Sequence, residues 1–132
     1  GGSTVFFSQL CKSVKAIECD PDWYPHSAER MEGIENITLI STDAVQMLGL
    51  IAVEPNHSYD LVLIDHRDAA VRRTNRLPAT EAALPKVKHG GWLVVDNYDA
   101  FGMGRFDYSR FDYRSYDDWR WSGRGTRICK IP

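Results

Sequence analysis

The chain has 132 residues, enough for one domain with a sizeable core, and its 43% hydrophobic and 26% charged content is ordinary for a globular protein. Its formal net charge of -2 argues against a general nucleic-acid surface, although a local basic patch stays compatible with it. No apolar run approaches the roughly 18 residues of a membrane span. The three widely spaced cysteines lack a CxxC motif, so we expect reduced thiols and a cytoplasmic protein.

The first residues predict a glycine loop that opens a helix. Gly1 and Gly2 are typical of a loop that binds phosphate or carboxylate, and either Ser3 or Thr4 would cap a helix over residues 4–11. Because glycine pairs are common, this signal is weak by itself.

Two strand–helix units come next. A short strand over residues 14–18 ends in an acidic side chain, and Asp20 followed by proline starts a helix that we expect to reach about residue 32. A further strand over residues 37–40 leads to Asp43, which would cap the following helix.

The stretch from residue 59 to residue 97 organises the chain. Two short apolar runs, residues 61–64 and 92–95, each stop at an acidic residue, as expected of parallel strands buried on both faces. Residues 73–89 would form the crossover helix, with two glycines as its stop. The carboxyl ends of both strands would then meet at one edge of the sheet, where ligands bind in such folds.

The last third is rich in aromatic and charged side chains. We expect residues 101–121 to form an excursion that covers the carboxyl edge of the sheet, and residues 126–131 to form a final antiparallel edge strand. The alternating order of elements predicts an α/β fold with a Rossmann-like, doubly wound, mostly parallel sheet in a single domain.

Glu18 is a candidate ligand for an adenine nucleoside. A carboxylate at a strand end can accept both ribose hydroxyls, and the glycines upstream favour this over a merely solvated glutamate. The third glycine of a GxGxxG motif is missing after Gly2, which argues for a ligand without a pyrophosphate. Asp43 and Ala44 could contact the adenine amino group, and this is compatible with Asp43 also acting as a helix cap.

Asp65, Asp96 and Asn97 follow the two neighbouring strands. Their carboxylate and amide oxygens suit Mg²⁺, which takes hard oxygen ligands. The alternative is that Asp65 ends its strand and the other two residues begin a turn. Residue type alone leaves the two interpretations even. His66 follows Asp65 directly and would line the site.

Together these motifs resemble the class I S-adenosylmethionine-dependent methyltransferases, and the similarity runs from Gly1 to about Asn97. The resemblance implies cofactor contacts from several segments: Gly1, Gly2, Ser3, Thr4, Glu18, Cys19, Asp43, Ala44 and Asp65. It rests further on the Leu-Ile-Asp-His end of the third apolar strand and on the Gly-Gly turn that leads into the Asp-Asn strand end.

Within that superfamily the Asp-His and Asp-Asn pairs look like those of metal-dependent O-methyltransferases. There the equivalents of Asp65, Asp96 and Asn97 hold Mg²⁺. Those enzymes have a lysine base three residues after the first aspartate, and this chain has Asp68. The catalytic candidates are therefore Asp65, His66 and Asp68, and the departure puts a catechol substrate in doubt.

The sequence thus predicts an enzyme that methylates a small-molecule or sugar hydroxyl, with or without a metal, and with no nucleic-acid or membrane partner. A Rossmann-type oxidoreductase and a non-catalytic cofactor-binding module are the alternatives. Because the family places a strand before its glycine loop, we also expect an N-terminal truncation, with that strand missing between residues 14–18 and 61–65.

Overall fold

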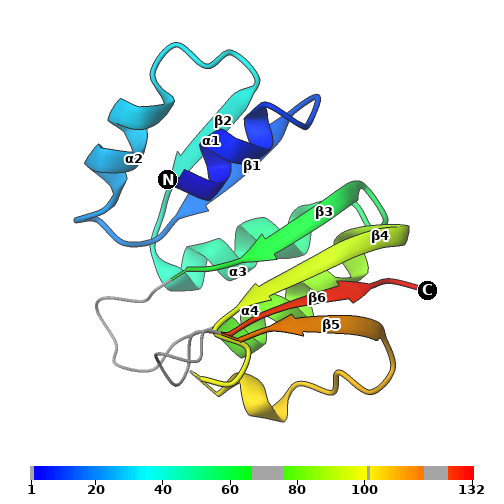
Figure 1. Cartoon of the computed structure of the whole chain (residues 1–132). Helices are drawn as coiled ribbons and strands as arrows, with labels where there is room; N and C mark the ends of the chain where they lie inside the picture. The colour runs from blue at the N-terminus through cyan, green and yellow to red at the C-terminus, as the bar shows by residue number, and fades with distance from the viewer. Residues whose placement is uncertain (1, 67–75, 101, 118–124) are drawn as a thin grey trace. The chain divides into compact units, whose positions relative to one another are not determined.

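The structure, a computed structural model, describes residues 2–66, 76–100, 102–117 and 125–132. Its strands form two sheets, and the chain divides into two compact units, Gly1–Met47 and Leu48–Pro132 (Figure 1). Within the described ranges, no helix is both long and apolar enough to cross a membrane. The mixed order of helices and strands, with the parallel pairs β1–β2 and β3–β4, confirms the predicted α/β class.

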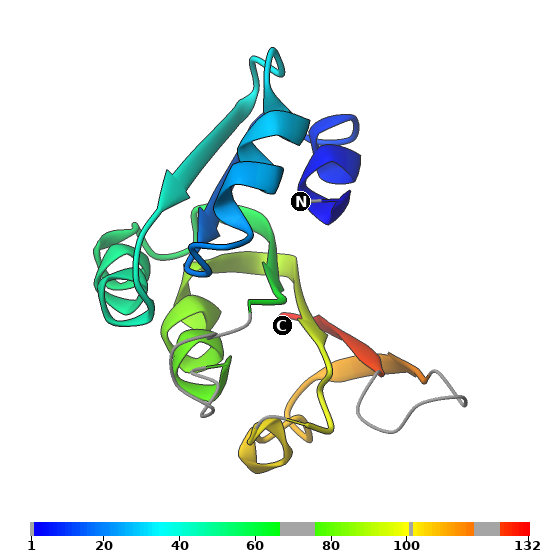
Figure 2. The ribbon, with the colours of Figure 1, turned by 90° about the vertical axis from the view of Figure 1, so that its left-hand side faces the viewer.

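The first unit is a parallel strand pair with two helices on one face (Figure 2). Its elements are α1 (Gly2–Ser8), β1 (Val14–Glu18), α2 (Tyr24–Met31) and β2 (Ile37–Ser41). In the register of the pair Glu18 lies opposite Ser41, so both strands end at the same edge. The side-chain amide of Asn36 donates to the carbonyls of Ser8 and Cys11 at 2.8 and 3.0 Å, which fixes the turn after α1.

Two predictions about this unit need correction. Ser3 and Thr4 lie within the first turn of α1 and do not cap it, because the helix begins at Gly2. The second helix begins at Tyr24 rather than beside Asp20, since a hydrogen-bonded turn comes first. In that turn Asp20 accepts the backbone N–H of Asp22 at its carboxylate and those of Trp23 and Tyr24 at its carbonyl.

The second unit contains a four-stranded sheet. Helix α3 (Ala44–Val53) leads into it, and its strands lie in the order β3-β4-β6-β5. The elements are β3 (Tyr59–Ile64), α4 (Arg76–Ala83), the 3-10 turn η1 (Leu84–Lys86), β4 (Val87–Asp96), the 3-10 turn η2 (Met103–Arg105), β5 (Asp112–Tyr116) and β6 (Thr126–Lys130).

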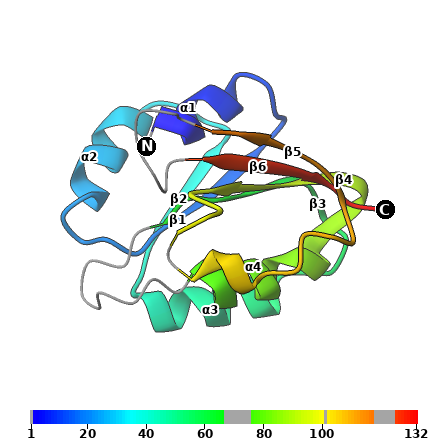
Figure 3. The ribbon, with the colours of Figure 1, turned by 60° about the horizontal axis from the view of Figure 1, so that its bottom comes forward.

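The last strand is antiparallel, as predicted, but it is not an edge strand. β6 pairs with β4 on one side and with β5 on the other (Figure 3). The edge is β5, whose side chains are all exposed. The alternation of side chains along residues 126–131 carries no information about which strand lies next to β6.

The crossover helix is shorter than predicted. Of the expected range 73–89, the first three residues lie outside the described part; α4 ends at Ala83, and Pro85 sits in the 3-10 turn that follows. Gly90 and Gly91 belong to β4 and do not stop a helix. Gly90 has a φ of +74°, and a Cβ on Gly91 would lie 2.9 Å from the carbonyl oxygen of Asp60. The glycines therefore form an irregularity that lets β4 approach β3.

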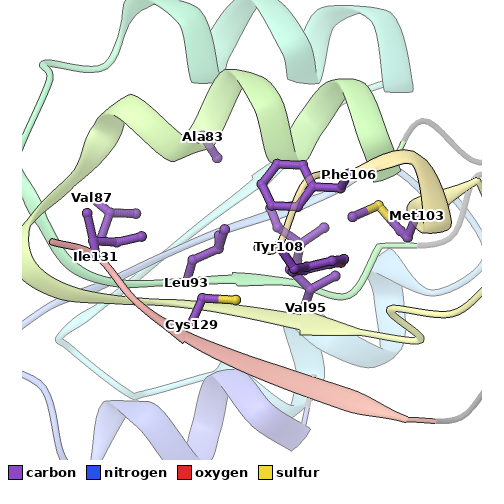
Figure 4. Close-up of a cluster of buried hydrophobic side chains, with 10 residues drawn as sticks. Ala83, Val87, Leu93, Val95, Met103, Phe106, Tyr108, Cys129 and Ile131 are labelled. Atoms are coloured by element: carbon purple, nitrogen blue, oxygen red, sulfur yellow. The ribbon is translucent and has the colours of Figure 1, made fainter. Parts of the chain in front are cut away.

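The core of the second unit lies between the sheet and α4 with η2, which occupy the same face of the sheet (Figures 3 and 4). Leu93, Val95 and Cys129 from the strands are fully buried, so Cys129 is a core residue. Met103, Phe106 and Tyr108 also belong to this core. This corrects part of the expectation for residues 101–121, because Phe106 and Tyr108 pack inside the unit and residues 112–116 extend the sheet, whereas Tyr113 and Tyr116 are exposed.

A buried lysine joins the end of α3 to the 3-10 turn η1. The ammonium of Lys86 donates to the carbonyls of Ala52 and Glu54 at 3.0 and 2.8 Å and to the side chain of Asn56 at 2.9 Å. A cation at the carboxyl end of a helix satisfies carbonyls that have no partner within the helix, and it also interacts favourably with the helix dipole.

Candidate active site

The carboxyl edge of the first unit carries the predicted nucleoside-binding residues. The carboxylate oxygen Oε1 of Glu18 accepts the backbone N–H of Asp20 at 3.0 Å. Its other oxygen, Oε2, makes no hydrogen bond within the described part of the chain. The carbonyl of Glu18 accepts the N–H of Thr42, which holds the two strand ends together at the predicted position.

Asp43 is a helix cap, as predicted. One carboxylate oxygen accepts the backbone N–H groups of Val45 and Gln46 at 2.9 and 2.8 Å, at the start of α3. Cys19 is buried behind the edge, whereas Ala44 is half-buried at the first position of α3. Gly2 is helical rather than part of a loop, and Gly1 lies outside the described residues.

The carboxyl edge of the second unit brings Asp65, Asp96 and Asn97 together, as the parallel pairing of β3 with β4 requires. They meet around a side chain that the sequence analysis did not select. The guanidinium of Arg76 lies 3.5 Å from Asp65 Oδ1 and 3.9 Å from Asp96 Oδ2, and it donates to Asn97 Oδ1 at 2.9 Å.

Two backbone carbonyls fix the position of the Arg76 guanidinium. Its Nε donates to the carbonyl of His66 at 2.8 Å and its Nη1 to the carbonyl of Asp96. The side chain of Arg76 is 4% exposed, whereas those of Asp65 and Asp96 are 49% and 31% exposed. The guanidinium is therefore the buried part of the site, and the two carboxylates are the part that solvent reaches.

The pKa of Asp65 is raised above that of an ordinary aspartate. Burial, the charge of Asp96 and a hydrogen bond to Asp96 raise the pKa of Asp65 from 3.8 to about 6, against the opposing effect of the Arg76 charge. Two carboxyl groups that share a site cannot both ionise easily, which accounts for the direction of this shift. A carboxylate with that pKa is ionised at neutral pH and accepts a proton more readily than an ordinary aspartate.

The other two catalytic candidates differ in what the structure says of them. His66 is half-buried, and its carbonyl oxygen, rather than its ring, makes the contact with Arg76. Asp68 lies outside the described residues.

The residues of this edge do not fit a Mg²⁺ site. Arg76 already donates to Asn97 Oδ1, one of the three predicted ligands, and it lies beside the other two. Among the described residues there is also no group of three or more His, Cys, Asp or Glu that could hold a metal ion. A divalent cation would have to share its ligands with a buried positive charge that cannot be deprotonated.

Sequence patterns did contain a signal for Arg76. The buried face of α4 consists of Arg76, Ala79, Thr80 and Ala83, so the arginine occupies a core position of a short amphipathic helix. A charged residue at such a position is almost never buried without a partner.

An arginine surrounded by tyrosines flanks this edge. The guanidinium carbon of Arg127 lies 3.8 Å from the ring centre of Tyr98 and 4.4 Å from those of Tyr108 and Tyr113. The neighbouring residue of β6, Thr126, donates its hydroxyl to Asp96 at 2.9 Å. The aromatic side chains therefore form a wall next to the acidic residues.

Comparisons with known protein families identify the family to which the chain belongs. A family model described as a methyltransferase domain matches residues 1–98. No curated protein matches the chain.

Solved structures with the same fold have low sequence identity. A Streptococcus mutans protein in complex with SAH is 22% identical, with a TM-score of 0.67 over 99% of this chain and 83% of that one. An rRNA methylase of Streptococcus thermophilus is 21% identical, with a TM-score of 0.67 over 100% and 81%. The O-methyltransferase TomG of Streptomyces achromogenes in complex with SAM is 13% identical, with a TM-score of 0.71 over 99% and 68%. At these identities the likeness is one of fold.

Proposed function

Because the chain belongs to the methyltransferase-domain family, as a class I S-adenosylmethionine-dependent methyltransferase, we propose that it methylates a hydroxyl oxygen of a small molecule or sugar. The observation that carries this proposal is Asp65, an exposed carboxylate at a strand end whose pKa is raised to about 6. A hydroxyl acceptor must lose its proton during methylation, and a carboxylate tuned in this direction suits that step.

The reaction follows from the chemistry of the cofactor. The acceptor oxygen attacks the sulfonium methyl carbon in line, the carbon–sulfur bond breaks, and sulfur leaves with the electron pair as the thioether of S-adenosylhomocysteine. The hydroxyl proton passes to Asp65. Holding the two reactants in line can supply roughly 7–11 kcal/mol of the barrier, and a positioned base contributes about 10²–10⁴-fold.

In this proposal the first unit binds the adenosine part of the cofactor. Glu18 has Oε2 available for ribose hydroxyls while Oε1 keeps its contact with Asp20. Asp43 and Ala44 would contact the adenine from the start of α3. The rest of the cofactor would lie along residues 1–4, which offer two glycines and two hydroxyl side chains, and along Cys19, as the family resemblance implies.

The acceptor would lie on the second unit. Tyr98 and Tyr113, which contact Arg127, are the partly exposed aromatic side chains near Asp96, and aromatic walls with a few polar groups are typical of small-molecule sites. No metal has a role in this proposal, because Arg76 occupies the place between the predicted ligands.

The test is transfer of a labelled methyl group. The protein is incubated with S-[methyl-³H]adenosylmethionine and, separately, with phenols, sugars and RNA. Label in a phenol or sugar that is lost with Asp65→Asn supports the proposal. Label in RNA alone would contradict it and favour the class of the Streptococcus thermophilus relative. Cofactor binding without transfer to any acceptor would leave a non-catalytic module.

A further inference from the structure

We propose that the guanidinium of Arg76 is a built-in cation that takes the place of a divalent metal at the ends of β3 and β4. The metal-dependent enzymes that the sequence resembles use an added ion to hold their strand-end acidic groups. Here the chain would supply the positive charge itself. The inference rests on the proposed function only for the role of Asp65, and its main test needs no turnover.

The contacts of Arg76 match those expected of such a cation. Its Nη1 donates to Asn97 Oδ1 at 2.9 Å and to the carbonyl of Asp96, and the guanidinium lies within 3.5 and 3.9 Å of the two carboxylates. One positive group thus contacts all three residues whose oxygens would otherwise coordinate a metal.

The backbone at Asn97 supports the same arrangement. Asn97 has a φ of +51°, a left-handed conformation that asparagine tolerates better than most residues. In this conformation its side-chain oxygen is turned toward Arg76. Because an arginine offers only donors, its contact also fixes which amide atom of Asn97 faces the site.

The burial of Arg76 explains why an added ion would compete poorly. The guanidinium is fixed in place by the His66 carbonyl at 2.8 Å, and its side chain is only 4% exposed. It cannot move into solvent to make room without breaking that contact. It also remains charged across the accessible pH range, so no change of pH would release the site to a metal.

Removal of the arginine should therefore create a metal site. In Arg76→Ala the two carboxylates and the amide would stay at the strand ends, with space for an ion and water where the guanidinium was. Mn²⁺ is the probe, because its bound and free forms differ in electron paramagnetic resonance. We expect Arg76→Ala to bind Mn²⁺ at least about tenfold more tightly than the unaltered chain, and the double variant with Asp65→Asn to lose that binding.

Arg114→Ala is the matched control, because Arg114 is an exposed arginine of β5 in the same unit. It should bind Mn²⁺ no better than the unaltered chain. Arg76→Lys keeps a positive charge and should also show no gain. Circular dichroism establishes which variants are folded. If Arg76→Ala fails to fold, the unaltered chain and Arg76→Lys still decide the question.

Two results would overturn the inference. One is Mn²⁺ binding by the unaltered chain that disappears in Asp65→Asn and in Asp96→Asn. The other is a folded Arg76→Ala variant with no gain in Mn²⁺ binding. Once an acceptor is known, methyl transfer by the unaltered chain should also resist EDTA, whereas Arg76→Ala should respond to Mn²⁺. The absence of any acceptor would count against the proposed function and leave the binding result intact.

Discussion

The acidic residues at the two carboxyl edges are held in different ways. In the first unit Glu18, Asp20 and Asp43 accept backbone N–H groups two or three residues further along the chain. In the second unit Asp65 and Asp96 meet Arg76, which lies 11 and 20 positions away in the sequence. The local contacts each involve one carboxylate, whereas the long-range cluster places two carboxylates close together and raises the pKa of Asp65.

The two units also differ in how many buried apolar side chains form their cores. The buried apolar side chains of the first unit are Cys19, Met31 and Met47, whereas the second has a continuous cluster that includes several fully buried residues. Rigid packing is what allows charged groups to be held close together against their repulsion. The first unit therefore offers single polar side chains that can bind a cofactor. The second unit holds two carboxylates close together in spite of their repulsion.

The largest expected effect is on Asp65. Asp65→Asn keeps the shape of the side chain but removes the base, so kcat should fall by about 10²–10⁴-fold while S-adenosylhomocysteine affinity stays unchanged. Asp60→Asn is the control, since Asp60 lies at the other end of β3 in an exposed ion pair with Lys88. An unchanged kcat in Asp65→Asn would remove the base assignment.

The raised pKa of Asp65 predicts how kcat and stability depend on pH. The pKa of Asp65 is raised, so kcat should fall as the pH drops through about 6 and stay level above it. The effect on stability has the opposite sign: the contribution of this group is present below its unfolded pKa and is lost as the pH rises through about 6. Urea midpoints at pH 5 and pH 7, compared between the unaltered chain and Asp65→Asn, would measure that difference. A steeper loss of stability toward pH 5 caused by Asp65 would contradict the sign.

The next effect concerns the packing of the second unit. Lys86→Met should lower the free energy of unfolding by about 1.5–3 kcal/mol, because it removes charge-assisted hydrogen bonds to two backbone carbonyls. Lys88→Met removes only an exposed ion pair and should cost about 0–1 kcal/mol. Urea denaturation of both variants measures the contrast. Equal losses would mean that burial of Lys86 adds nothing.

Cofactor binding tests the first unit. Glu18→Ala should weaken S-adenosylhomocysteine affinity by roughly tenfold to a hundredfold, since a charged hydrogen bond contributes about 1.5–3 kcal/mol. Glu35→Ala is the control, because Glu35 is exposed and precedes β2 at the opposite edge of the same strand pair. Isothermal calorimetry that finds equal affinities for the two variants would rule out the ribose assignment.

The smallest expected effect is the helix cap. Asp43→Ala should cost about 1 kcal/mol of stability, because two N–H groups at the start of α3 lose their acceptor. Asp43→Asn keeps an oxygen acceptor and should cost much less. Thermal melts of the two variants would establish whether Asp43 acts as a cap; similar melting temperatures would argue against that role.

Much of the fold could be predicted because it depends on short-range patterns. Both ends of the strand over residues 14–18 were predicted correctly. The helix cap at Asp43 could also be predicted, because it depends on residues only two and three positions away. The family itself could be identified from the order of strand-end motifs, and the match over residues 1–98 confirms it. The site was predicted in outline, since parallel pairing of β3 and β4 brings Asp65, Asp96 and Asn97 to one edge.

The sequence by itself determined the α/β class, the strand ends and the residues that gather there, because periodicity and capping are set by neighbours in the chain. The tertiary structure alone decided what lies between those residues. It placed Arg76 under the two carboxylates, moved the aromatic residues Phe106 and Tyr108 into the core, and put β6 inside the sheet. Each of these depends on which distant segments share a face or an edge, and that is fixed by packing rather than by spacing along the chain.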